Sequence, residues 1–131
     1  MNAKARAESA DWYRRARRDM RAAALGMRVG PEHRCFFAQQ AAEKAIKTLV
    51  FAQIDFPYTH DLNRLRELVP PEFTAMSDLP KLSELSAWAI RSRYGGEGKD
   101  AARRDAAVAI DTARTVLAAV RHDLKERGLK I

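Results

Sequence analysis

The sequence predicts an all-α fold: one up-and-down four-helix bundle with one additional short helix, formed by residues 1–131 as a single domain. Alanine occupies 24 positions, whereas valine, isoleucine and threonine together occupy 16, so strong helix formers outnumber residues suited to a sheet. The strong helix breakers lie at 30–31, 57, 70–71, 80 and 95–98. Between them the apolar residues recur at helical spacing, and the length is normal for one domain.

The first helix is expected from about Ala5 to Met27 and has two different sides. Its apolar residues share one arc of the helical projection: Trp12, Tyr13, Ala16, Met20, Ala23, Ala24 and Met27. The adjoining outer arc holds four arginines, Arg14, Arg17, Arg18 and Arg21. One side of this helix therefore packs, and the other forms a cationic stripe.

The second helix is expected from about Pro31 to Gln53, because proline suits the first turn of a helix. Small residues that allow close helix approach cover one side: Ala38, Ala41, Ala42, Ala45, Leu49 and Ala52. The other side combines three phenylalanines (Phe36, Phe37 and Phe51) with a polar strip of Gln40, Lys44 and Lys47, bordered by Glu43. A helix enclosed on most sides is expected to be central.

Three further helices follow. A short one is expected over about 61–68, with Thr59 or Asp61 as its N-cap. The next is expected over about 78–92, with Leu82, Leu85 and Ala89 facing inward. The last is expected over about 100–127, ended by Gly128. Its buried arc is expected to hold Ala102, Ala106, Ala109, Ala113, Val116, Leu117, Val120 and Leu124.

The chain carries a net charge of +7, and 17 of its 24 basic residues are arginine. This favours a polyanionic partner, although an arginine-rich coding bias gives the same composition. No apolar run is long enough to span a bilayer, and no secretory signal is recognised, so no membrane partner is expected. The single cysteine, Cys35, has no partner for an internal disulfide, which favours a cytoplasmic location.

No metal or cofactor site is predicted. The three histidines, His33, His60 and His122, lie on different elements, and Cys35 reads as a small packed side chain. The glycines at 95–98 are interpreted as a turn rather than a phosphate-binding loop.

The segment 89–95 is the most informative. Arg93 continues the stripe of Leu82, Ser86 and Ala89, so its charge is directed toward the bundle and requires a partner. That partner is a bound anion, with Arg91 and Tyr94 beside it, or else Glu43 or the carbonyls at the helix end. Two further alternatives stay open. His60 contacts a ligand or stabilises the turn, and the polar strip binds a ligand or pairs within the chain.

The run Phe36-Phe37-Ala38-Gln39-Gln40-Ala41-Ala42-Glu43-Lys44-Ala45-Ile46-Lys47 resembles the second-helix signature of HEPN (higher eukaryotes and prokaryotes nucleotide-binding) domains. Trp12, Asp19, the turn 59–62 and Arg93-Tyr94 extend the resemblance over about residues 10–125. It implies a helical bundle, commonly dimeric and often encoded beside a small nucleotidyltransferase, that binds nucleotide or cuts RNA as a toxin.

The ribonuclease branch of that family has an arginine, four to six residues and then a histidine near the end of the fourth helix. Here no histidine follows Arg91 or Arg93 before Asp105, so that catalytic pattern is absent where it is expected. The sequence therefore favours a binding domain over an enzyme, and no catalytic residue is assigned.

We therefore expect a groove between the second helix and the end of the fourth to bind nucleotide or RNA phosphate in a toxin–antitoxin-type or stress system. Its residues are Arg91, Arg93, Tyr94, Gln40, Lys44, Lys47 and His60. The expected protein partners are a second copy of the chain and a minimal nucleotidyltransferase. The alternatives are a HepT-like toxin ribonuclease that uses Arg93 and Tyr94 with a histidine from elsewhere in the chain, such as His60, and a non-catalytic dimerisation or interaction module.

Overall fold

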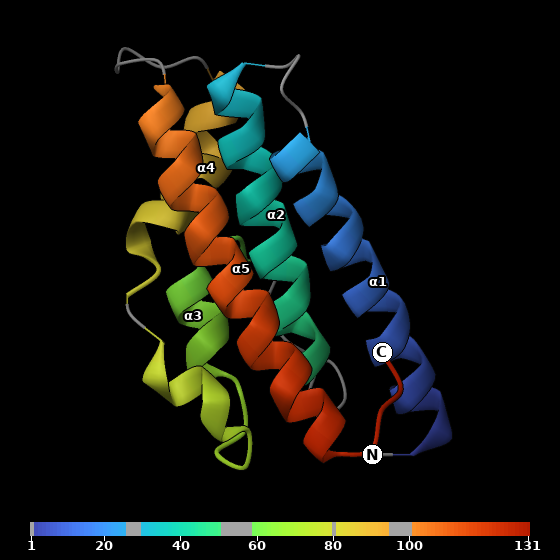
Figure 1. Cartoon of the computed structure of the whole chain (residues 1–131). Coiled ribbons are helices and arrows are strands. Elements are labelled where there is room, and N and C mark those ends of the chain that lie inside the picture. Colours follow the sequence, from blue (N-terminus) through green and yellow to red (C-terminus); the bar gives the residue numbers. More distant parts are fainter. Residues whose placement is uncertain (1, 26–29, 51–58, 80, 95–100) are drawn as a thin grey trace.

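The protein is an all-α bundle, as the sequence predicts (Figure 1). The computed structural model describes residues 2–25, 30–50, 59–79, 81–94 and 101–131, and for 91–94 it describes the backbone alone. The elements are α1 (Ala3–Leu25), α2 (Pro31–Val50), α3 (Leu62–Glu67), the short 3-10 helix η1 (Thr74–Asp78), α4 (Ser83–Tyr94) and α5 (Arg103–Glu126). These described ranges contain no strand.

Helix α2 lies in the middle of the bundle. It contacts α1 and α5 along its length, and it also contacts α3 and α4. Consecutive long helices run in opposite directions in Figure 1, the up-and-down arrangement of helices joined by short connections. The prediction that the second helix is central is confirmed.

The core between the long helices is built largely from alanine. The buried alanines of α1, α2 and α5 are Ala16, Ala23, Ala38, Ala41, Ala42, Ala45, Ala106, Ala109 and Ala113. Side chains this small allow helix axes to approach to about 8 Å. Larger side chains fill the remaining space, among them Ile46, Leu49, Val116 and Leu124. The predicted positions Phe51 and Ala52 lie outside the described residues.

Helix α1 has the two sides predicted for it. Among the predicted inward positions, Tyr13, Ala16 and Ala23 are buried and Trp12, Met20 and Ala24 are half-buried, while Met27 lies outside the described residues. The Tyr13 hydroxyl donates to the Leu117 carbonyl oxygen of α5 at 3.2 Å, and burial raises the pKa of this tyrosine. The four arginines of the predicted cationic stripe are all exposed.

The fourth helix begins later than predicted. It was expected from about Asp78, but α4 starts at Ser83, and residues 74–78 form η1 instead. Leu79 has extended backbone (φ −73°, ψ 145°), the conformation that a following proline imposes, and Pro80 follows it. A helix therefore cannot run through this point. The inward positions Leu82, Leu85 and Ala89 are buried, as predicted.

The last helix is also shorter at its start than predicted. Ala102, expected to be buried, is exposed as the N-cap of α5, and its backbone N–H donates to the Asp105 carboxylate at 2.8 Å. The end agrees with the prediction. Gly128 has a φ of 81°, and the Leu129 N–H donates to the Leu124 carbonyl oxygen at 3.1 Å across it.

Cys35 is a packed core side chain, as expected from the sequence. It is fully buried, and burial raises the pKa of its thiol to about 12. Since the thiolate is the reactive form, this cysteine is not a nucleophile near neutral pH.

Candidate functional site

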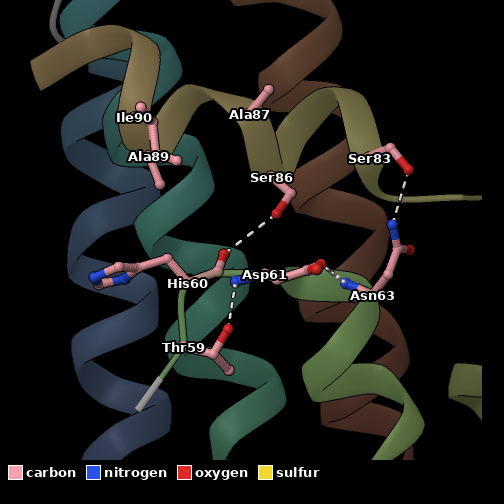
Figure 2. Close-up of a pocket in the computed structure, with 9 residues that line it drawn as sticks. All are labelled: Thr59, His60, Asp61, Asn63, Ser83, Ser86, Ala87, Ala89 and Ile90. Atoms are coloured by element: carbon pink, nitrogen blue, oxygen red, sulfur yellow. Dashed lines mark hydrogen bonds between the residues drawn. The ribbon is translucent and has the colours of Figure 1, made fainter. Parts of the chain in front are cut away.

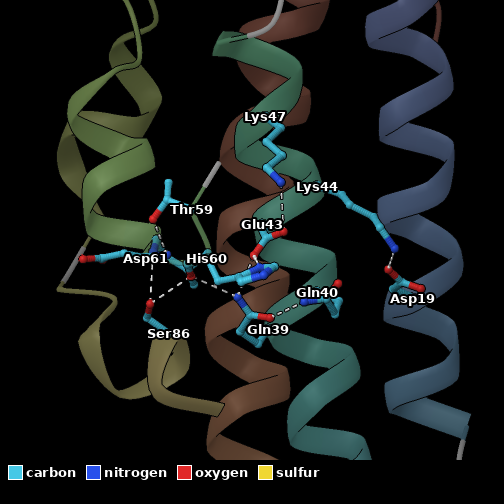
Figure 3. Close-up of polar contacts among 11 residues, drawn as sticks. Asp19, Gln39, Gln40, Glu43, Lys44, Lys47, Thr59, His60, Asp61 and Ser86 are labelled. Carbon is cyan, nitrogen blue, oxygen red and sulfur yellow. Dashed lines mark hydrogen bonds and ion pairs between the residues drawn. The ribbon is translucent and has the colours of Figure 1, made fainter. Parts of the chain in front are cut away.

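The turn before α3 is held between α2 and α4 through the backbone of His60. Its carbonyl oxygen accepts hydrogen bonds from Gln39 Nε2 of α2 at 3.3 Å and from Ser86 Oγ of α4 at 3.2 Å. The same Ser86 hydroxyl accepts from the Leu62 N–H at 3.0 Å. Three elements distant in sequence are thus joined at one residue (Figure 3).

Asp61, rather than Thr59, is the N-cap of α3. Its side chain accepts from the backbone N–H groups of Asn63 and Arg64, while the Thr59 hydroxyl accepts from the Asp61 N–H at 3.1 Å. Helix α3 is therefore capped without the His60 side chain. Of the two alternatives for His60, stabilisation of the turn is observed, because its imidazole contacts Glu43 of α2.

Glu43 is the centre of a polar cluster buried beneath that turn. Its Oε1 lies 2.7 Å from His60 Nδ1 and accepts from Gln39 Nε2 at 3.2 Å, and its Oε2 accepts from Lys47 Nζ at 3.0 Å (Figure 3). The Glu43 side chain is only 4% exposed and that of Lys47 10%. A carboxylate this deeply buried is retained only with such partners, because desolvation of an unpaired charge is costly.

The polar strip of α2 is directed to two different places. Lys47 points along α2 to Glu43, whereas Lys44 reaches away from the turn to form an ion pair with Asp19 of α1 (Figure 3). Gln40 Nε2 donates to Gln39 Oε1 at 2.7 Å. Of the two alternatives for this strip, pairing within the chain is observed for all three residues.

A hollow of about 560 Å³ opens between the turn and α4 (Figure 2). It is lined by Thr59, His60, Asp61, Asn63, Ser83, Ser86, Ala87, Ala89 and Ile90. One edge is fixed by Asn63, whose Nδ2 donates to Ser83 Oγ at 2.8 Å and whose Oδ1 accepts from the Leu82 N–H at 3.1 Å. The volume falls within the range of about 300–1,000 Å³ typical of ligand pockets.

The remaining predicted site residues lie at the end of α4. The backbone of Arg91, Arg93 and Tyr94 forms the last turn of this helix, and their side chains lie outside the described part of the chain. In helical register, Arg93 stands four residues after Ala89 and three after Ile90, two residues that line the hollow. The structure thus brings His60 and Lys47 to Glu43, places Gln40 beside Gln39 and directs Lys44 to α1, and none of these three α2 side chains lines the hollow.

The sequence gives Gln39 no individual role, and it places Glu43 at the border of the polar strip or as a partner of Arg93. A signal was present: Gln39, Glu43 and Lys47 are spaced four residues apart, which puts them on one ridge of α2. The contact with His60, seventeen residues later, had no comparable signal in the sequence.

The cluster holds His60 in one orientation. A carboxylate at a ring nitrogen fixes the tautomer and the direction of an imidazole, as in acid–base and ligand-binding sites. Among the described residues there is no group of three or more histidine, cysteine or acidic side chains that could hold a metal ion. Within the same ranges, no helix has the length and apolar character needed to cross a membrane.

The comparisons with known proteins agree with this architecture. The family model described as HEPN domain matches residues 9–123. The chain is also similar to the crystal structure of TT1696 from Thermus thermophilus, with 30% sequence identity and a TM-score of 0.72. That similarity covers 88% of this chain and 97% of the other. No curated protein is similar enough to count as a match.

Proposed function

The chain belongs to the HEPN domain family, and on this premise we propose that it binds a nucleotide or the phosphate of an RNA in the hollow beside His60. The observation that carries the proposal is the hollow itself. It combines ligand-sized volume with polar side chains from two elements, and it adjoins the helix that continues into Arg93 and Tyr94.

In this proposal the guanidinium groups of Arg93 and Arg91 bind phosphate, because their planar donors match phosphate oxygens in pairs. Tyr94 contacts the base or the ribose, and His60 forms the wall of the site. Gln40 was expected to share the role of Tyr94, but it donates to Gln39 and does not line the hollow. Lys47 pairs with Glu43 beside the turn, and Lys44 pairs with Asp19 on the α1 side, and neither lysine lines this hollow. The largest single contribution is therefore assigned to Arg93.

Isothermal titration of the full chain with ATP, GTP and a short RNA tests this assignment. We expect Arg93→Ala to weaken binding about 10- to 100-fold, because a charge-assisted hydrogen bond to phosphate is lost. Arg114→Ala, at an exposed arginine of α5, is the matched control and is expected to bind like the wild type. Absence of wild-type binding at low salt, or equal binding by Arg93→Ala, contradicts the proposal.

We extend the proposal to the protein partners implied by the family. The domain forms a homodimer and works with a small nucleotidyltransferase encoded beside it, in a toxin–antitoxin-type or stress system. Light scattering of the chain, alone and mixed with the neighbouring gene product, measures both associations. A monomer under all conditions, with no complex, refutes this extension and leaves ligand binding unaffected.

A second candidate function is RNA cleavage, favoured by the 2.7 Å contact between His60 Nδ1 and Glu43 Oε1. A histidine oriented by a carboxylate is an arrangement that accepts a proton in acid–base catalysis. If this function is present, purified protein cleaves RNA without added metal, and His60→Ala lowers the rate about 100-fold or more. A rate that is equal in the wild type and in His60→Ala assigns the cleavage to a contaminant.

A further inference from the structure

Helix α1 carries much of the positive charge of this chain. It contains seven basic and three acidic residues, and so provides four of the seven net positive charges. Six of its seven basic residues are arginine. Since α1 packs mainly on α2, its outer side faces solvent, and the arginines of the cationic stripe are all exposed on it.

The surface between this outer side and α2 is hollowed. The hollow measures about 510 Å³ and its cations are Arg14, Arg15 and Arg18 of α1 and Lys44 of α2. Asp11 lies 3.3 Å from Arg14 and 3.0 Å from Arg15, and Asp19 holds Lys44. Four cations against two carboxylates leave a surplus of two positive charges.

Arg18 supplies the least compensated of these charges. Among the described residues, no carboxylate lies within 4.0 Å of its guanidinium, whereas the other three cations each have one. The two carboxylates fix the neighbouring side chains in place and leave Arg18 exposed toward solvent. An anion from outside the chain is therefore favoured beside Arg18.

The arrangement along the helix fits a chain of phosphates better than one phosphate. Arg14, Arg18 and Arg21 follow one another at four and three residues, which aligns them along about 10 Å of one helix ridge. Trp12 lines the same hollow, and the Arg15 guanidinium lies 5.2 Å from its ring centroid. Arginines beside an aromatic ring are the usual components of single-stranded nucleic-acid surfaces.

We propose that this α1 hollow is a second binding surface, and that its ligand is the phosphate backbone of single-stranded RNA. The inference rests on the proposed function only in taking RNA as the ligand class. The hollow shares no lining residue with the one beside His60. A polynucleotide can occupy both surfaces while a mononucleotide occupies one, so the domain binds an RNA strand more tightly than a free nucleotide.

Fluorescence anisotropy of a labelled single-stranded oligouridine, with the full chain, tests the proposal. Arg14→Gln combined with Arg18→Gln is expected to weaken binding about tenfold and to reduce the slope of log K against log salt by about 1.4, or about 0.7 per phosphate contact. The control combines Arg64→Gln with Lys125→Gln, which removes two exposed charges from α3 and α5. It should retain near wild-type affinity.

The intrinsic fluorescence of Trp12 locates the bound strand. Titration with the unlabelled oligouridine should change the tryptophan emission of the wild type, and Trp12→Phe should abolish that change, since the other tryptophan, Trp88, is buried in the core. An emission change that persists in Trp12→Phe places the RNA elsewhere and overturns the proposal.

The remaining outcomes separate this surface from the first. Equal weakening by both double variants shows attraction to the general positive field and overturns the proposal. Weakening by Arg93→Ala without weakening by the α1 variant also overturns it, and leaves the proposed function intact. If oligoglutamate displaces the RNA when both are present at the same concentration of anionic groups, the ligand is an acidic protein and the RNA assignment is refuted. If the chain binds anionic vesicles as tightly as RNA and the α1 variant weakens both equally, the ligand is a lipid surface.

Discussion

Glu43→Ala should lower the free energy of unfolding by about 3–5 kcal/mol, the cost of breaking a buried ion pair from one side. The Lys47 ammonium, only 10% exposed, then loses the carboxylate 3.0 Å away. His60 loses its 2.7 Å contact in the same variant, so the turn that carries the proposed ligand site loses one of its attachments to α2. Urea denaturation followed by circular dichroism measures the change.

The matched control is the second ion pair of α2. Asp19→Ala breaks the pair with Lys44, whose side chain is 26% exposed against 15% for Asp19. Water and salt can replace the lost partner there, so a loss of about 1 kcal/mol is expected. Raising the ionic strength should shrink the Asp19 effect and leave the Glu43 effect almost unchanged, because buried pairs are screened less.

A double variant separates the ion pair from the packing around it. Glu43→Leu combined with Lys47→Met removes both charges and keeps the side-chain volume, so it should cost less than the sum of the two single changes. Equal losses for Glu43→Ala and Asp19→Ala, or a double variant that is strictly additive, contradict the view that burial of this pair determines its energy.

The fold could be predicted from the sequence because its signals are local. The periodic alanines and the few clustered breakers determine the helices, and Gly128 ends α5 through its own backbone conformation. The errors also have local causes. The helical pattern predicts a start for α4 that is too early, because Pro80 holds the preceding residue, Leu79, in an extended conformation.

The site could be predicted only in part, because its contacts are long-range. Helical spacing groups Gln40, Lys44 and Lys47 on one arc, but it does not say which neighbouring helix offers a carboxylate. Asp19 of α1 pairs with Lys44 and His60 of the turn contacts Glu43, whereas the pair of Lys47 and Glu43 lies within α2 at helical spacing. Pairings between residues 17 and 25 positions apart depend on how the helices pack. The periodicity of the sequence carries no information about that packing.

Ala113→Leu should lower the free energy of unfolding by about 3 kcal/mol, at the upper end of the usual cost of overpacking a core. Ala113 is fully buried on α5, which packs on α2, and both helices bury alanines. Three additional carbon atoms at this position must push the helices apart or force strained rotamers, since protein interiors leave few voids.

The control for this prediction is Ala118→Leu, at an exposed position of the same helix. Alanine and leucine differ little in helix propensity, so this variant should change stability by less than about 0.5 kcal/mol. Thermal and urea unfolding of both variants give the comparison. If Ala113→Leu is as stable as Ala118→Leu, the helices are not in close contact at Ala113. In that case alanine packing does not determine the position of α2, and it does not explain why the Glu43 cluster faces the turn and α4.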